Sequence, residues 1–116
     1  MIESVTNKMN IPGAVSHEYG ISEQDLHQKS KKRKITEPRM ITIALIVATG
    51  QAQQKDMATE FNLESATICH AVNTVRSMVR LNAKFRGRIV AILTNLSDSK
   101  PYRESIMERL LSVSRN

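Results

Sequence analysis

The segment that most constrains the fold of this chain is PRMITIALIVA, residues 38 to 48. A helix of this sequence is apolar nearly all round, so other elements must cover several of its sides. Pro38 suits the first position of such a helix, and Gly50 suits the position just beyond its end. Its longest apolar run, residues 40 to 48, is far shorter than the roughly 20 residues that cross a bilayer. We therefore predict a buried central helix that begins at Glu37 and Pro38.

The composition favours helices as the elements that cover this segment. The chain has 116 residues, enough for one domain, and 41% of them are hydrophobic, but only 3% are aromatic and Trp is absent. A core of Ile, Val, Leu, Met and Ala suits small helices better than a β-sandwich. We predict an all-α fold of about six or seven helices.

Helix signals occur on both sides of the central segment. Pro12 and Gly13 separate an N-terminal arm or helix from a further helical turn, which Gly20 ends. Ser22 is a good N-cap for the short helix that follows. Further helices are predicted over residues 52–61, from Glu64 onward, over 84–93, and over 101–113 after a linker at 97–100.

Positive charge is concentrated in the middle of the chain. The net charge is +6, and residues 26 to 96 carry 12 Lys and Arg against 4 Asp and Glu. The stretch KSKKRKIT, residues 29 to 36, has five of these cations and no apolar periodicity, so we predict a basic loop. A second basic strip follows further on, at Arg76, Arg80, Lys84, Arg86 and Arg88. This balance favours an anionic partner, either nucleic acid or an acidic membrane surface.

The cysteine and histidine content gives no sign of chemistry. Cys69 is the one cysteine, so no intrachain disulfide can form, and we expect it to be a small space-filling residue. The N-terminus has no signal-peptide pattern, which favours the cytoplasm. His17, His27 and His70 are scattered, and no carboxylate pair or nucleophile–base set stands out. We predict no enzyme activity, no metal site and no cofactor.

Residues 56 to 78, DMATEFNLESATICHAVNTVRSM, have the pattern of a helix-turn-helix. This unit needs a small residue in the first helix, a turn residue, and branched apolar residues on the inner face of the second helix. Ala58 and Asn62 supply the first two, and the inner face is formed by Leu63, Ile68 and Ala71. The outward positions of the second helix can then meet base edges in a major groove, and they are Ser65, Ala66, Thr67, His70 and Asn73.

Each of these features also has a plain structural explanation. Two helices joined by a tight turn occur in many all-α cores, a basic stretch is often a solvated loop, and His70 taken singly is usually an ordinary surface residue. The excess of positive charge around the two-helix unit is the reason to favour DNA as the partner.

Two stretches of the chain, in the correct order, resemble one known family. VSHEYGISEQDLHQKSKKRKITEPRMITIAL (15–45) and ATICHAVNTV (66–75) are similar to the C-terminal, DNA-box-binding domain (domain IV) of the bacterial replication initiator DnaA, a Trp-repressor-like helical fold. The resemblance extends from Val15 to Leu93. Accordingly, we divide the chain into an N-terminal arm or helix (1–12), a helix-turn-helix domain (13–96), and a C-terminal linker with an amphipathic helix (97–116).

The resemblance implies particular DNA contacts. The family's minor-groove arm corresponds to the basic stretch Lys31, Lys32, Arg33 and Lys34, and its arginine after the proline corresponds to Arg39. Thr67 and His70 match residues of its second motif. In our hypothesis, Arg39 and Lys55 hold phosphates while the helix from Ser65 enters the major groove.

The chain departs from the family pattern at the positions that read bases. The family's Asp-His-Thr is replaced by Glu64, Ser65 and Ala66, and the Leu-Pro that opens its preceding helix is replaced by Gln54 and Lys55. The sequence that is read is therefore expected to differ from the usual initiator box. The chain also has no phosphate-binding loop of the G-x-x-x-x-G-K-[ST] type. We expect a stand-alone relative of the domain that binds no nucleotide, as a phage or mobile element would carry.

The resulting hypothesis is a sequence-specific double-stranded DNA-binding protein linked to replication initiation or its regulation. Two alternatives stay open on the sequence. One is a helix-turn-helix regulator of transcription. The other is a protein-interaction module whose C-terminal helix binds a partner or a second copy of the chain through Ile106, Leu110 and Leu111. No membrane partner is expected.

Overall fold

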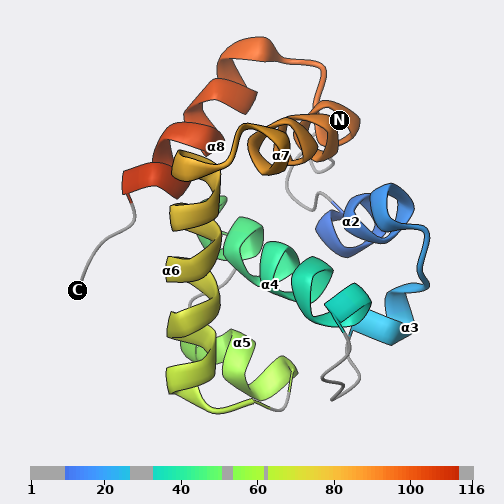
Figure 1. Ribbon diagram of the computed structural model, residues 1–116, viewed down its shortest axis with the longest axis vertical. Coiled ribbons are helices and arrows are strands. Elements are labelled where there is room, and N and C mark those ends of the chain that lie inside the picture. Colours follow the sequence, from blue (N-terminus) through green and yellow to red (C-terminus); the bar gives the residue numbers. More distant parts are fainter. Residues whose placement is uncertain (1–9, 27–32, 51–53, 62, 113–116) are drawn as a thin grey trace, which may run out of the picture.

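The computed structural model of the chain describes residues 10–26, 33–50, 54–61 and 63–112. Within these residues the regular secondary structure is entirely helical (Figure 1), which confirms the predicted all-α class. The described chain forms seven helices, in the order α2 (Ile11–Tyr19), α3 (Glu23–Leu26), α4 (Arg33–Ala48), α5 (Gln54–Glu60), α6 (Ser65–Leu81), α7 (Ala83–Leu96) and α8 (Lys100–Ser112).

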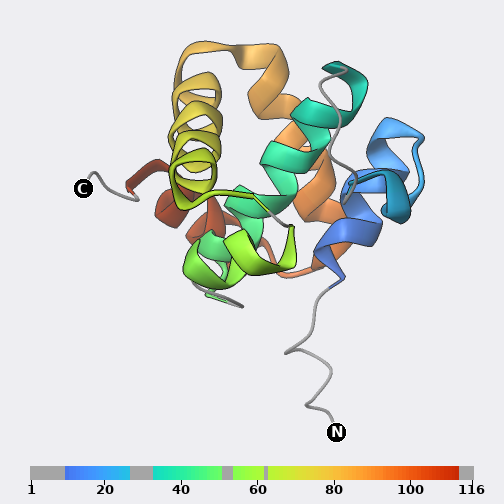
Figure 2. The ribbon, with the colours of Figure 1, turned by 90° about the horizontal axis from the view of Figure 1, so that it is seen from below.

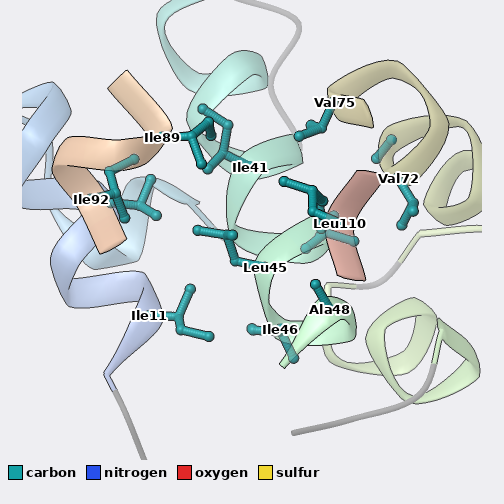
Figure 3. Packing of buried hydrophobic residues seen from close by; sticks show 14 of the residues in the cluster. Ile11, Ile41, Leu45, Ile46, Ala48, Val72, Val75, Ile89, Ile92 and Leu110 are labelled. Atoms are coloured by element: carbon teal, nitrogen blue, oxygen red, sulfur yellow. The ribbon is translucent and has the colours of Figure 1, made fainter. Parts of the chain in front are cut away.

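Helix α4 is the centre of the molecule, as its sequence predicts. It packs against α2, α3, α6 and α8, and Ile41, Ala44 and Leu45 have no exposed surface. In Figure 3 the side chains of α4 lie between those of α7 on one side and those of α6 and α8 on the other. Helices from both halves of the chain thus cover the segment that is apolar all round, and this arrangement fixes where the surface helices stand.

The start of α4 differs from the prediction. The helix begins at Arg33 rather than Glu37, so Arg33 and Lys34 belong to its first turn and not to a loop. Pro38 therefore lies in the second turn, where its missing N–H removes the helical hydrogen bond to the carbonyl of Lys34. The burial of Ile35, which is 7% exposed, holds this turn against the rest of the molecule. The prediction missed this turn because it relied on apolar repeats. Arg and Lys favour helices but add no apolar residue to such a repeat.

Helix α2 also begins earlier than expected. Pro12 and Gly13 lie inside its first turn instead of preceding it, and Asn10 is the N-cap, with its side chain accepting a hydrogen bond from the Gly13 N–H at 3.1 Å. Gly20 ends the helix in the left-handed region, with φ of 68°, as predicted. Ser22 then caps α3 through a 3.2 Å hydrogen bond from the Asp25 N–H to its hydroxyl. Residues 1–9 lie outside the described chain.

Helix α8 packs into the same core. It contacts α4, α6 and α7, and Ile106 and Leu110 are buried among their side chains. Two of the residues expected to bind a partner therefore face the interior, whereas Leu111 is only partly buried. The amphipathic pattern of α8 is the mark of its packing on the core. The proposed domain limits at residues 13 and 96 remain predictions.

Candidate nucleic-acid interface

Helices α5 and α6 form the two-helix unit that the sequence predicts. They pack against each other (Figure 2), with Met57 and Phe61 buried and Ala58 partly buried. At the turn between them, the Leu63 N–H donates a 2.9 Å hydrogen bond to the Ala58 carbonyl, five residues earlier. A hydrogen bond across five residues is typical of a helix C-terminus at which the chain reverses direction. Asn62, the predicted turn residue, lies outside the described residues.

One face of α6 attaches it to the core. The buried residues recur every three or four positions, and they are Ile68, Ala71, Val72, Val75 and Val79. This stripe includes the predicted inner-face residues Ile68 and Ala71, and Leu63 is partly buried beside it. Because α6 packs against α4, α5, α7 and α8, its rotation about its own axis is fixed, and so is the direction of its other face.

The opposite face of α6 is polar and open. Ser65, Ala66, Thr67 and His70 are exposed, as predicted, and Asn73 is partly buried. The face carries no charge between Ser65 and Thr74. A surface of hydroxyl, amide, imidazole and methyl groups offers donors, acceptors and small apolar contacts, which are the groups that distinguish base pairs in a major groove.

Local hydrogen bonds hold two of these side chains. The Thr74 hydroxyl lies 3.3 Å from His70 Nε2, and the Asn73 amide donates to Cys69 Sγ at 3.6 Å. Cys69 is exposed, so the expectation that it fills space is wrong. The prediction also missed Ser77, which is exposed on the same face. Its position could have been found, because residues 66, 70, 73 and 77 follow the spacing of one helix face.

The N-terminus of α6 is open as well. Its N-cap, Glu64, has an extended backbone (φ −77°, ψ 153°) and makes no side-chain capping hydrogen bond. The first hydrogen bond of the helix runs from the Ile68 N–H to the Glu64 carbonyl at 3.1 Å. The N–H groups of the exposed first turn therefore have no partner within the helix and lie at the positive end of the helix dipole. This arrangement favours the binding of phosphate oxygens.

The predicted backbone contacts are described in part. Lys31 and Lys32 lie outside the described residues, while Arg33 and Lys34 are in the first turn of α4 and Gln54 and Lys55 open α5. Arg39 is partly buried in α4, and this burial lowers the pKa of its guanidinium from the usual value. In Figure 1 the first turns of α4 and of α6 both lie in the lower half of the molecule.

The second basic strip lies toward the C-terminal end of α6 and on α7. Helix α6 has 17 residues and so is about 25 Å long, which places Arg80 and all of α7 toward its other end (Figure 1). Arg86 donates a 2.8 Å hydrogen bond to the carbonyl of Val79, and the Arg88 guanidinium lies 4.6 Å from the centre of the Tyr19 ring. These two cations thus fasten helices to one another, which the count of charges could not reveal.

Other kinds of site find little support in the described part of the chain. Among those residues, no three His, Cys, Asp or Glu side chains come together in a group that could hold a metal ion. No helix among them combines the length and apolarity that a bilayer crossing demands.

These features define the helix-turn-helix class of DNA-binding proteins. A short helix precedes a second helix that packs on the core through its apolar face, and the second helix has a polar outer face and an open N-terminus. The family model described as the bacterial dnaA protein helix-turn-helix matches residues 9–75. The chain belongs to this family, and the predicted resemblance is confirmed.

One curated relative is the chromosomal replication initiator protein DnaA of Campylobacter fetus subsp. fetus (strain 82-40). It is 25% identical to this chain over 92 residues, which make up 78% of the chain and 21% of the relative. The chain thus spans about a fifth of the length of that protein.

Proposed function

We propose that this protein binds particular sequences of double-stranded DNA by placing the first turns of α6 in a major groove. The observation that carries this proposal is the exposed polar face formed by Ser65, Ala66, Thr67 and His70, next to an open helix N-terminus. Asn73 and His70 supply hydrogen bonds to base edges, while Ala66 and the Thr67 methyl group pack on thymine methyls.

Backbone contacts set the register of the protein on the duplex. The basic residues Lys31, Lys32, Arg33 and Lys34 approach the adjacent minor groove, and Arg39, Gln54 and Lys55 contact phosphates. The family resemblance supports the roles of the basic stretch and of Arg39, and the concentration of positive charge between residues 26 and 96 supports phosphate contacts in general.

The sequence read by α6 differs from that of a typical initiator. Glu64, Ser65 and Ala66 occupy the positions of the Asp-His-Thr that the family uses at the start of this helix. A hydroxyl and a methyl group in place of an imidazole and a second hydroxyl change the pattern of donors and acceptors. DNA docking is therefore kept while base preference changes.

The biological role that fits this activity is replication initiation or its regulation. It rests on the family and on the relative named as a replication initiator. Mapping the bound sites onto the genome of the source organism tests it. Sites clustered at a replication origin support the role, and sites confined to promoters favour a transcription regulator instead.

Selection of bound sites from a random duplex pool, followed by titration across salt, tests the DNA-binding proposal. We expect one enriched motif and a slope of log K against log salt that corresponds to about four or more phosphates. His70→Ala or Asn73→Ala relaxes preference at one or two positions of the motif with little change in the slope. A pool without enrichment and a flat salt dependence would contradict the proposal.

A further inference from the structure

Three helices meet at one polar contact. The Tyr19 hydroxyl of α2 donates a hydrogen bond to Glu37 Oε2 of α4, and the Arg88 guanidinium of α7 lies over the Tyr19 ring at 4.6 Å from its centre. We call Tyr19, Glu37 and Arg88 the tyrosine clamp. Tyr19 and Glu37 are 18 residues apart in sequence. The clamp therefore joins the segments before and after the basic stretch.

The surroundings of the clamp keep it engaged. Burial raises the pKa of the Tyr19 hydroxyl, and its hydrogen bond to the Glu37 carboxylate raises it further, so that the hydroxyl stays protonated and remains a donor. Glu37 and Arg88 also line one groove of about 390 Å³ between α4, α6 and α7, together with Met78, Asn82, Lys84 and Phe85. The opposite charges of Glu37 and Arg88 thus occur in one partly enclosed space.

The clamp lies beside the proline of α4. Pro38 follows Glu37 directly and removes the helical hydrogen bond that would reach the Lys34 carbonyl. A residue before proline is also disfavoured in helical conformation. The first turn, from Arg33, is therefore joined to the rest of α4 by fewer bonds than usual, and the contact of Glu37 with α2 adds a restraint at this junction.

The charge of Glu37 makes the contact relevant to DNA. Glu37 follows the five Lys and Arg of residues 29 to 34 and precedes Arg39. A carboxylate that points freely from this part of α4 would repel phosphate and compete for the same cations. Hydrogen bonding to Tyr19, beside the Arg88 cation, holds the carboxylate on the side of the helix that faces α2.

We propose that Tyr19 and Arg88 are positioning residues for DNA binding, which hold Glu37 and thereby orient the first turns of α4 so that Arg39 meets the phosphate backbone. The inference rests on the proposed function, since it concerns how the same interface is held. Neither positioning residue touches DNA. Their effect is on the number of phosphate contacts, and base preference is set separately by α6.

The test compares the two tyrosines of the chain on the selected duplex. Tyr19→Phe keeps the ring under Arg88 but removes the hydroxyl, and we expect about tenfold weaker binding with a salt slope smaller by about one or two phosphates. The order of preference among duplex sequences stays unchanged. Tyr102→Phe is the matched control, because Tyr102 is exposed on α8, and it leaves affinity within about twofold. Circular dichroism confirms that each variant is folded at the temperature used.

Two changes at Glu37 separate position from charge. Glu37→Gln keeps an oxygen that accepts from Tyr19, so it binds DNA as tightly as the unmodified protein or more tightly. Glu37→Ala loses the contact and shows the reduced salt slope of Tyr19→Phe. A folded Tyr19→Phe protein with unchanged affinity and slope overturns the inference, and so does a Glu37→Gln loss equal to that of Glu37→Ala. Both outcomes leave the proposed function standing, whereas an unmodified protein that binds no duplex refutes that function itself.

Discussion

Thr42 is a polar side chain at the centre of the molecule. It is 0% exposed, and its hydroxyl donates a 2.9 Å hydrogen bond to the carbonyl of Pro38. That carbonyl lies one helical turn earlier, so its regular helical partner is the N–H of the same threonine. The hydroxyl is thus satisfied without a contact to any other helix, and its methyl group packs in the core.

This arrangement predicts that two small substitutions at Thr42 change the free energy of unfolding by different amounts. Thr42→Val removes the hydroxyl but keeps the shape and changes the free energy of unfolding by less than about 1 kcal/mol. Thr42→Ser keeps the hydroxyl but deletes a buried methyl group, and costs about 1 kcal/mol or more. Urea unfolding of the two variants gives the comparison. A valine variant that is the less stable of the two would show that the hydroxyl matters more than packing.

Tyr19 predicts how stability depends on alkaline pH. Burial, followed by the hydrogen bond to Glu37, raises the pKa of its hydroxyl above the ordinary tyrosine value of about 10. Above that value the unfolded chain binds fewer protons than the folded protein, so the free energy of unfolding falls as pH rises. Urea titrations at about pH 9 and pH 11 should show a smaller fall for Tyr19→Phe than for the unmodified protein.

At the scale of elements, sequence patterns were informative where an apolar repeat exists. The stripe Ile68, Val72, Val75 and Val79 placed α6 and the direction of its polar face, and MITIALIVA placed the buried part of α4. The first turn of α4 was missed because a helix made of charged residues has no such repeat, and its stability comes from contacts made elsewhere in the chain. Pro38 added to the error, since it is usually found at a helix start.

Ser77 tests whether the outward face of α6 is the one that approaches DNA. It is exposed and lies three turns along from Ala66 on the same face. Ser77→Glu places a negative charge there and should weaken binding to every duplex sequence by about tenfold or more at low salt. The matched control is Ser105→Glu on α8, where the serine is also exposed. DNA affinity is measured by fluorescence titration. Equal losses of affinity in the Ser77→Glu and Ser105→Glu variants would show that this face of α6 does not approach the DNA.

At the scale of the whole molecule, the contacts that sequence reasoning missed are those between distant residues. Two examples are the hydrogen bonds from Tyr19 to Glu37 and from Arg86 to the Val79 carbonyl. Both depend on how the helices are arranged relative to one another, and no local sequence pattern encodes that arrangement. The same holds for Ile106 and Leu110, whose apolar repeat predicted a buried face but not what would cover it. The family resemblance added independent support for DNA as the partner, which the charge distribution had already favoured.

The dimensions of the protein predict the length of DNA that one copy protects. Its principal extents are 36 × 30 × 28 Å, close to the 34–36 Å of one DNA helical turn. Hydroxyl-radical footprinting on a selected duplex should therefore show protection of about 10 to 12 base pairs without two-fold symmetry. Two equal protected regions one turn apart would instead indicate that a pair of copies binds.

The attachment of α6 has a mechanical consequence. Its C-terminal end is fastened by the Arg86 hydrogen bond and by Asn82, whose side chain caps α7 through the Phe85 N–H at 3.0 Å. The apolar stripe that begins at Ile68 packs the rest of this helix of 17 residues on the core. Over a length of about 25 Å, a tilt of only 2–3° at the fastened end displaces the first turn by about 1 Å, which is enough to misalign hydrogen bonds to bases. Substitutions that repack the corner between α6 and α7 should therefore change which DNA sequences the protein binds, although none of the substituted residues contacts DNA.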